Sequence, residues 1–190
     1  MPIIHEHNIT LHGNKDITLR PLTDKHLPLL YKWNSDLEVL YWSDGDDIIE
    51  PYNESTVNLI YGNVSQNAFC FLIEVAGIPV GDCWLQKMNI KNISDRYPDN
   101  VDVRRIDYCI GAKENWGKGI GTECLQMLLN FAFYVQKVDV LYIMVYNYNI
   151  RSVRMVEHAG FKLEITNSIC DSKKAKYEFL YKMSRNDYCC

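Results

Sequence analysis

The sequence has no lysine, arginine or histidine between Trp33 and Gln86. The same stretch carries nine acidic residues, so the net charge of −4 hides one strongly acidic segment in an otherwise basic chain. A nucleic-acid-binding protein needs a continuous basic surface, and this distribution argues against that partner. The acidic segment is interpreted either as a solvated face or as a binding site for a cationic ligand.

Long hydrophobic runs are also missing. No apolar run approaches the roughly 20 residues of a membrane span, and residues 1–7 lack the basic patch and apolar stretch of a secretory leader. We therefore expect a cytoplasmic protein with no membrane partner. A length of 190 residues with 47% apolar and 23% charged residues is typical of one globular domain, here 1–190 with a core over about 17–183.

Metal-binding patterns are absent as well. None of the seven cysteines forms a C-x-x-C pair, which excludes zinc-finger and thioredoxin-like motifs. His5, His7 and His12 lack the H-E-x-x-H spacing, so we expect no metal site. An odd number of cysteines, several of them inside apolar runs, favours free thiols in a reducing compartment.

Hydrophobic periodicity and turn signals predict a mixed α/β fold. The expected elements are a strand (17–20), a helix from about residue 23, a helix from Asn53 to Gly62, strands over 68–75, 78–88 and 101–110, a helix from about 120 to 136, a strand over 138–145, a helix over 149–160 and strands over 161–169 and 175–183. The polar segment 89–100 is expected to be a loop. The strand–helix–strand unit implies one parallel crossover, and the hairpins imply a mostly antiparallel central sheet with helices on both faces.

The strongest local motif is N-W-G-K-G-I-G-T at residues 115–122, between a predicted strand and a predicted helix. Alternating glycines let main-chain N–H groups converge, and a helix N-terminus adds partial positive charge, which suits a pyrophosphate. It is not a Walker A loop, because five residues separate Gly111 from Gly117 and Lys118 is followed by glycine. It is not a dinucleotide fingerprint either, because Cys124 stands where the last glycine is needed. A purely structural turn is the alternative.

Two motifs in this order resemble the GNAT superfamily of acetyl-CoA-dependent N-acetyltransferases. Gly119 and Gly121 match the small positions of the family loop Q/R-x-x-G-x-G/A, with Trp116 in place of the usual Gln or Arg. Residues 149–161 look like the family helix N-x-x-A/S-x-x-x-x-E-x-x-G-F. Within the superfamily, residues 106–111 and 116–122 are most similar to aminoglycoside 6′-N-acetyltransferases. The ribosomal-protein N-terminal acetyltransferases share much of this pattern.

The resemblance implies direct transfer of an acetyl group from acetyl-CoA to a primary amine of a small polycation, most of all an aminoglycoside 6′-amine, by a monomer or homodimer. The residues that it places at the cofactor are Cys109, Ile110, Trp116, Gly117, Lys118, Gly119, Ile120, Gly121, Thr122, Asn149 and Arg154. Main-chain N–H groups near Cys109 and Ile110, where the strand splays, would stabilise the thioester oxygen.

The resemblance also points to Asp107 as the group that holds the ammonium and takes its proton. The alternative is an acid that is merely paired with Arg104 or Arg105. The residues expected to bind the polycation are Trp42, Asp44, Glu50, Asp82, Asp99 and Asp107. Trp42 would be a wall for a sugar ring, or else an ordinary core residue.

Two positions depart from the family pattern. Val156 stands where many members have a tyrosine that protonates the leaving thiolate, so either another donor such as water or Tyr148 serves, or the thiolate leaves unassisted. Met144 stands where some aminoglycoside enzymes have an aspartate. Cys109 is interpreted as a packing residue, because direct transfer needs no acyl-enzyme. The remaining alternatives are a protein N-terminal acetyltransferase and a degenerate GNAT module that binds a ligand without turnover.

Overall fold

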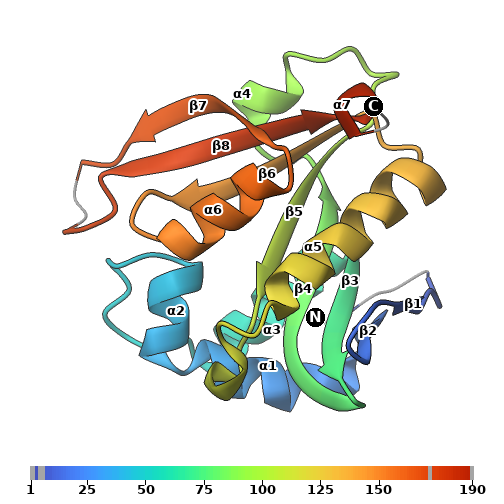
Figure 1. Cartoon of the computed structure of the whole chain (residues 1–190). Coiled ribbons are helices and arrows are strands. Elements are labelled where there is room, and N and C mark those ends of the chain that lie inside the picture. The colour runs from blue at the N-terminus through green and yellow to red at the C-terminus, as the bar shows by residue number, and fades with distance from the viewer. Residues whose placement is uncertain (1–2, 4–6, 171–172, 189–190) are drawn as a thin grey trace.

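One mixed sheet of eight strands runs through the protein in the order β1-β2-β3-β4-β5-β6-β8-β7 (Figure 1). The computed structural model describes residue 3 and residues 7–170 and 173–188. The strands are β1 (Leu11–His12), β2 (Ile17–Pro21), β3 (Ala68–Val75), β4 (Ile78–Lys87), β5 (Val103–Cys109), β6 (Val140–Tyr146), β7 (Lys162–Ser168) and β8 (Tyr177–Ser184). The helices are α1 (Leu27–Asn34), α2 (Leu37–Ser43), α3 (Glu54–Ser65), α4 (Lys91–Ser94), α5 (Ile120–Asn130), α6 (Ile150–His158) and α7 (Arg185–Tyr188), with short turns η1 (Asp24–His26), η2 (Lys113–Asn115) and η3 (Phe131–Val135).

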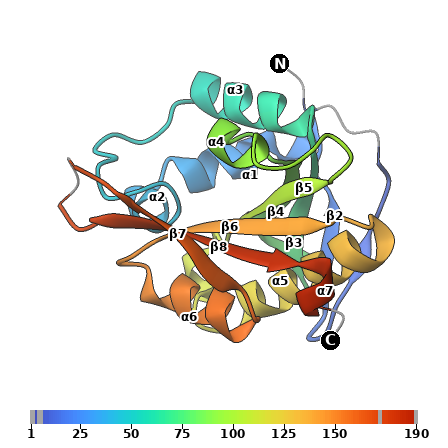
Figure 2. The ribbon, with the colours of Figure 1, turned by 90° about the horizontal axis from the view of Figure 1, so that it is seen from above.

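The predicted topology is confirmed. β5 and β6 pair in parallel and are joined through α5, whereas the other neighbouring strands pair antiparallel. Helices α1, α3 and α4 cover one face of the sheet, and α5 and α6 cover the other (Figure 2). The crossover through α5 therefore puts the glycine-rich motif at one end of the sheet, directly after β5.

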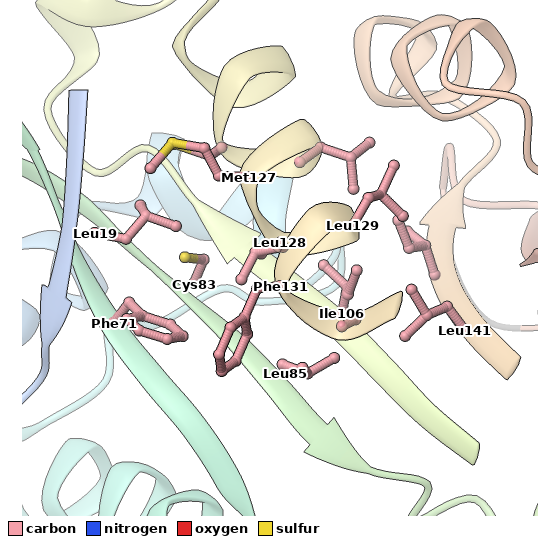
Figure 3. Packing of buried hydrophobic residues seen from close by; sticks show 14 of the residues in the cluster. Leu19, Phe71, Cys83, Leu85, Ile106, Met127, Leu128, Leu129, Phe131 and Leu141 are labelled. Carbon is pink, nitrogen blue, oxygen red and sulfur yellow. The ribbon is translucent and has the colours of Figure 1, made fainter. Parts of the chain in front are cut away.

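The largest part of the core lies between α5 and the centre of the sheet (Figure 3). Leu125, Leu128 and Leu129 of α5 are almost fully buried there against strand residues such as Leu85 and Ile106. Each such side chain stabilises the fold by roughly 1.5–3 kcal/mol. This packing holds α5, and with it the glycine-rich motif, rigidly on the sheet. Within the described residues, none of the helices has both the length and the apolar character needed to cross a bilayer.

The structure differs from the sequence prediction at several elements, and the two-residue strand β1 and the single-turn helix α7 were not expected. Helix α2 was not expected, because it spans two turns and buries only Val39 and Leu40, too few for a periodic pattern. Helix α3 does not stop at Gly62 but continues to Ser65, since Gly62 is buried inside it. The segment predicted as loop, 89–100, contains the single-turn helix α4.

Gly81 lies where β4 passes closest to the end of β5. A Cβ atom at this position would overlap the carbonyl oxygen of Cys109 and would lie 3.0 Å from the Cα atom of Ile110. Both are main-chain atoms, so neither can turn away as a side chain could. The absence of a side chain at Gly81 is therefore what lets β4 and β5 stay paired up to Cys109.

We expect Gly81→Ala to lower the free energy of unfolding by roughly 1–3 kcal/mol, the usual cost of an overpacked contact. Urea-induced unfolding measures this change. Gly121→Ala is the matched control, because a Cβ atom there would make only ordinary contacts, the nearest at 3.5 Å to Met155. Equal stability of the two variants would contradict the close approach at Gly81.

Candidate functional site

The sheet opens between two neighbouring strands, β5 and β6. They are paired only as far as Ile106 and Ile143. Beyond that point β5 stays paired with β4 up to Cys109, while β6 stays paired with β8 up to Tyr146. The two strands therefore diverge, and the splay predicted near Cys109 is confirmed.

Two adjoining cavities lie at this opening. The first, of about 270 Å³, is lined by four carboxylates and is called the acidic cavity. The second, of about 330 Å³, is lined by the 115–122 loop and is called the glycine-loop cavity. The residues that line both are Trp42, Ser43, Tyr108, Cys109, Asn149 and Ser152. A shared wall would let two molecules bound in the two cavities touch, which is the geometry that a group transfer requires.

The glycine-loop cavity is formed at the N-terminus of α5. Gly117 and Gly119 have φ values of 75° and 79°, in the left-handed region that glycine adopts at little cost. Side chains added at these glycines would point into open space, apart from one contact at 3.4 Å between Gly119 and the Lys15 amine. The Trp116 indole donates a 2.6 Å hydrogen bond to the carbonyl oxygen of Ile110 and so ties the loop to the end of the sheet. The motif thus forms an open rim of main-chain groups next to the positive end of a helix, which suits a phosphate.

Most of the predicted cofactor residues line this cavity. They are Cys109, Ile110, Trp116, Gly117, Gly119, Ile120, Gly121, Thr122 and Asn149. Lys118 and Arg154 are not among the lining residues, and both are exposed. Instead Arg151 lines the cavity, with its guanidinium carbon 5.8 Å from the centre of the Trp42 ring. Arg151 is in the first turn of α6, and Arg154 is one turn further along the axis. Which of the two lines the cavity depends on where the helix lies against the sheet, and the sequence does not show this.

The floor of the acidic cavity is one face of the β4–β5 pair. Alternate residues of each strand point to this face, and the register puts Asp82 opposite Cys109 and Trp84 opposite Asp107. These four side chains line the cavity. Asp44, Asp82, Asp107 and Glu178 supply its carboxylates, and Arg105 is the single basic side chain among its lining residues. The cavity as a whole therefore favours a cationic guest.

Asp82 is the most deeply buried of these acids, at 3% exposure. It accepts hydrogen bonds from the Tyr61 hydroxyl at 3.2 Å and from the Trp84 indole at 2.8 Å. Burial raises the pKa of its carboxyl to about 7, and the nearby charges of Asp44 and Asp107 add to the rise. A cation entering the cavity would favour the ionised form of Asp82, so binding of that cation would release a proton.

Asp107 is held through one of its two carboxylate oxygens. Arg105 Nε and Gln86 Nε2 both donate to Oδ2, at 2.9 Å and 2.6 Å. Arg104 pairs with Asp102 instead, at 3.0 Å. Among the described residues, none donates a hydrogen bond to Oδ1 of Asp107. The pairing with Arg105 that the sequence left open is therefore present, but it leaves one oxygen available to the cavity.

Helix α2 is fixed to the cavities through its main chain. The hydroxyls of Tyr148 and Tyr146 donate to the carbonyl oxygens of Tyr41 and Asp44, respectively. The Asn149 amide donates to the carbonyl oxygen of Trp42 at 3.0 Å. These contacts place the Trp42 ring in the wall of both cavities and the Asp44 carboxyl in the acidic cavity. Partial desolvation in the cavity raises the pKa of that carboxyl.

Two predicted substrate residues lie elsewhere. Glu50 is exposed in the loop before α3, and Asp99 is exposed in the loop after α4. Neither lines the acidic cavity. Sequence reasoning missed Glu178, which β8 carries to the cavity because it pairs opposite Tyr146 at the end of β6. Its distance along the chain from the acidic segment hid it, and only the β6–β8 pairing brings it to this place.

A pair of hydroxyls lies on the shared wall. Tyr108 Oη donates to Ser152 Oγ at 3.0 Å, and both residues line both cavities. Burial raises the pKa of Tyr108 to about 12, so its hydroxyl keeps its proton at neutral pH. Val156 is fully buried in the core, and the Tyr148 hydroxyl is directed to the Tyr41 carbonyl.

The structure also shows the surroundings of the Cys109 thiol and of His7. Burial raises the pKa of the Cys109 thiol well above its usual range, so the thiol is protonated and is a poor nucleophile. His7 packs against the rings of Phe69 and Phe71, and His5 lies outside the described residues. The described part of the chain contains no group of three or more His, Cys, Asp or Glu side chains that could hold a metal ion.

Comparison with known proteins gives a consistent result. The family model of the acetyltransferase (GNAT) domain matches residues 16–162. Aminoglycoside N(6')-acetyltransferase type 1 of Klebsiella pneumoniae is 25% identical over 173 residues, which cover 86% of this chain and 82% of that protein. Spermidine N-acetyltransferase from Vibrio cholerae, solved with coenzyme A and spermine, has a TM-score of 0.73 at 19% identity and covers 93% of this chain and 100% of its own. Aminoglycoside acetyltransferase AAC(6')-Ib with coenzyme A has a TM-score of 0.72 at 20% identity, covering 90% and 96%.

The raised pKa of Asp82 makes the stability of the protein depend on pH. A carboxyl whose folded pKa is above its ordinary value of 3.8 stabilises the fold at low pH and loses that contribution as the pH rises through about 7. An asparagine carries no charge at either pH. The free energy of unfolding of Asp82→Asn, taken relative to that of wild type, should therefore rise by roughly 2–3 kcal/mol from pH 5 to pH 8.

Thermal or urea unfolding at the two pH values measures this gain. Asp36→Asn is a control, because a hydrogen bond from Lys113 lowers the pKa of that half-buried carboxyl and leaves it ionised at both pH values. The control should show the same stability difference from wild type at pH 5 and pH 8. If the stability difference between Asp82→Asn and wild type is the same at both pH values, the pKa of Asp82 is not raised in the folded protein.

Proposed function

Because the chain belongs to the GNAT acetyltransferase family, which its match over residues 16–162 shows, we propose that it acetylates a primary amine of a small polycation, an aminoglycoside first of all. The observation that carries this proposal is the group of four carboxylates, Asp44, Asp82, Asp107 and Glu178, in one cavity that adjoins the glycine-loop cavity. The 25% identity with an aminoglycoside N(6')-acetyltransferase supports the choice of substrate.

The glycine-loop cavity fits the pyrophosphate of acetyl-CoA. Gly117 and Gly119 keep the rim free of side chains, and the N-terminus of α5 supplies partial positive charge. Arg151 adds a full positive charge at the same cavity. When bound, acetyl-CoA supplies the thioester carbonyl that the amine attacks. Main-chain N–H groups at Cys109 and Ile110 are the proposed donors for the negative charge that develops on its oxygen.

The acidic cavity would hold the amine and remove its proton. An amine is mostly protonated at neutral pH, so it must lose a proton before or during attack. Oδ1 of Asp107 is the available acceptor at the cavity wall, next to Tyr108 and Cys109 of the same strand. Asp44, Asp82 and Glu178 would neutralise further ammonium groups of a polyamine or an aminosugar, and Trp42 would provide an apolar wall.

The Tyr108–Ser152 pair is the proposed proton source for the leaving thiolate. It lies on the wall shared by the two cavities, where the products separate. Ser152 is one helical turn before Val156, so its hydroxyl reaches the same side of α6 as the family tyrosine would. The proton of Ser152 would pass to the thiolate and that of Tyr108 to Ser152.

The free state of all five described cysteines agrees with a cytoplasmic location.

Gly119→Val tests the cofactor half of the proposal. A β-branched residue at a φ of 79° is strained and fills the open rim, so the dissociation constant of coenzyme A should rise at least about tenfold. Calorimetric titration measures it without turnover. Gly77→Val is the matched control, because Gly77 has almost the same φ, 77°, in the β3–β4 turn, where a Cβ atom meets nothing within 4 Å. If both variants bind coenzyme A as tightly as wild type does, the pyrophosphate does not bind at the glycine-rich loop.

A thiol-release assay tests the acceptor half, with kanamycin, spermidine and a short peptide as amines. We expect kanamycin to be the best of the three. Asp107→Asn should lower kcat/KM by about 10²–10⁴-fold, the usual worth of a general base, and leave coenzyme A binding unchanged. Glu50→Gln, which removes an acid outside the cavity, should change little.

Each of the other outcomes would support an alternative function. Preference for spermidine would mean a polyamine acetyltransferase, and preference for the peptide would mean a protein N-terminal acetyltransferase. Coenzyme A binding without turnover of any amine would mean a ligand-binding module. Wild-type turnover by Asp107→Asn would remove Asp107 as the base.

A further inference from the structure

Gln86 is a buried polar residue that does not line either cavity. It is 4% exposed, and its side-chain nitrogen lies 2.6 Å from Oδ2 of Asp107. In the β4–β5 register Gln86 is opposite Arg105, and Trp84, on the same face, is opposite Asp107. Gln86 therefore approaches Asp107 diagonally across the strand pair, from within the protein.

The two donors to Asp107 act on the same oxygen. A carboxylate can rotate about its last bond, and an arginine that meets it alone tends to grip both oxygens. Arg105 does not do so: its Nε atom reaches Oδ2 at 2.9 Å, and its Nη1 atom lies 3.5 Å from the sulfur of Met144. With Gln86 also on Oδ2, two donors fix the orientation of the carboxylate, and Oδ1 receives no hydrogen bond from the described residues.

We propose that Gln86 is a positioning residue for Asp107. It fixes the carboxylate so that Oδ1 stays available to the amine, and it prevents Arg105 from closing on both oxygens. The proposal rests on the proposed function, in which Asp107 accepts the proton of the amine. Gln86 acts through Asp107 and not by direct contact with the amine or the cofactor, because it lines neither cavity.

The first test is Gln86→Leu, which removes the donor and keeps most of the side-chain volume. A hydrogen bond to a charged group is worth enough to change kcat about 10-fold to 100-fold. We expect such a fall in kcat for kanamycin, with no change in its KM or in the affinity for coenzyme A, because Gln86 lines neither cavity.

Leu85→Val is the matched control for general damage to β4. Leu85 is fully buried next to Gln86 but on the opposite face, in the core under α5. Its truncation should lower the melting temperature without lowering kcat. If Gln86→Leu changes only the melting temperature, as this control does, Gln86 is a structural residue and the proposal is wrong.

A double-mutant cycle with Asp107→Asn separates the remaining outcomes. Gln86→Leu should have no further effect on kcat in the Asp107→Asn background, because it acts through Asp107. The same fold-change in both backgrounds would overturn the positioning role and leave the proposed function intact. If Asp107→Asn alone keeps wild-type turnover, both the base and its positioning residue are disproved.

Discussion

The separation of β5 from β6 after Ile106 is the constraint on which the rest of the site depends. Each strand is held by its other neighbour, β5 by β4 and β6 by β8, so the sheet cannot close the opening without breaking one of these ladders. Main-chain groups at the opening and the side chains around it are thereby presented to two cavities at once. The close approach of Gly81 to Cys109 keeps the β4–β5 ladder intact up to the opening.

The two cavities differ in their electrostatics. One cavity has carboxylates from the residue after α2 and from β4, β5 and β8, and the other combines a helix N-terminus with Arg151. Burial first, and then the charges of Asp44 and Asp107, raise the pKa of Asp82 to about 7. A cation that binds in the acidic cavity near neutral pH would therefore displace a proton from Asp82.

The sequence was sufficient for the long elements and the glycine-rich loop, because their periodicity and turn chemistry are local. The strand over 68–75 matches β3 residue for residue, and the crossover topology followed from the element order. The sequence was insufficient for residues that reach the site only through the pairing of strands distant in the chain. Glu178 reaches the cavity only through the β6–β8 ladder, and the contact of Gln86 with Asp107 depends on the β4–β5 register. The choice of Arg151 over Arg154 required the position of α6 along its axis.

The attachment of α2 has a consequence for how this protein can change. The carbonyl oxygens of Tyr41, Trp42 and Asp44 receive the bonds that hold the segment, and every residue type carries such an oxygen. The side chains at these positions can therefore be exchanged by mutation while the anchoring bonds persist. The shape and charge of the cavity wall at Trp42 and Asp44 can therefore change by substitution while the main-chain attachment of α2 is kept, as in loops carried on a rigid framework.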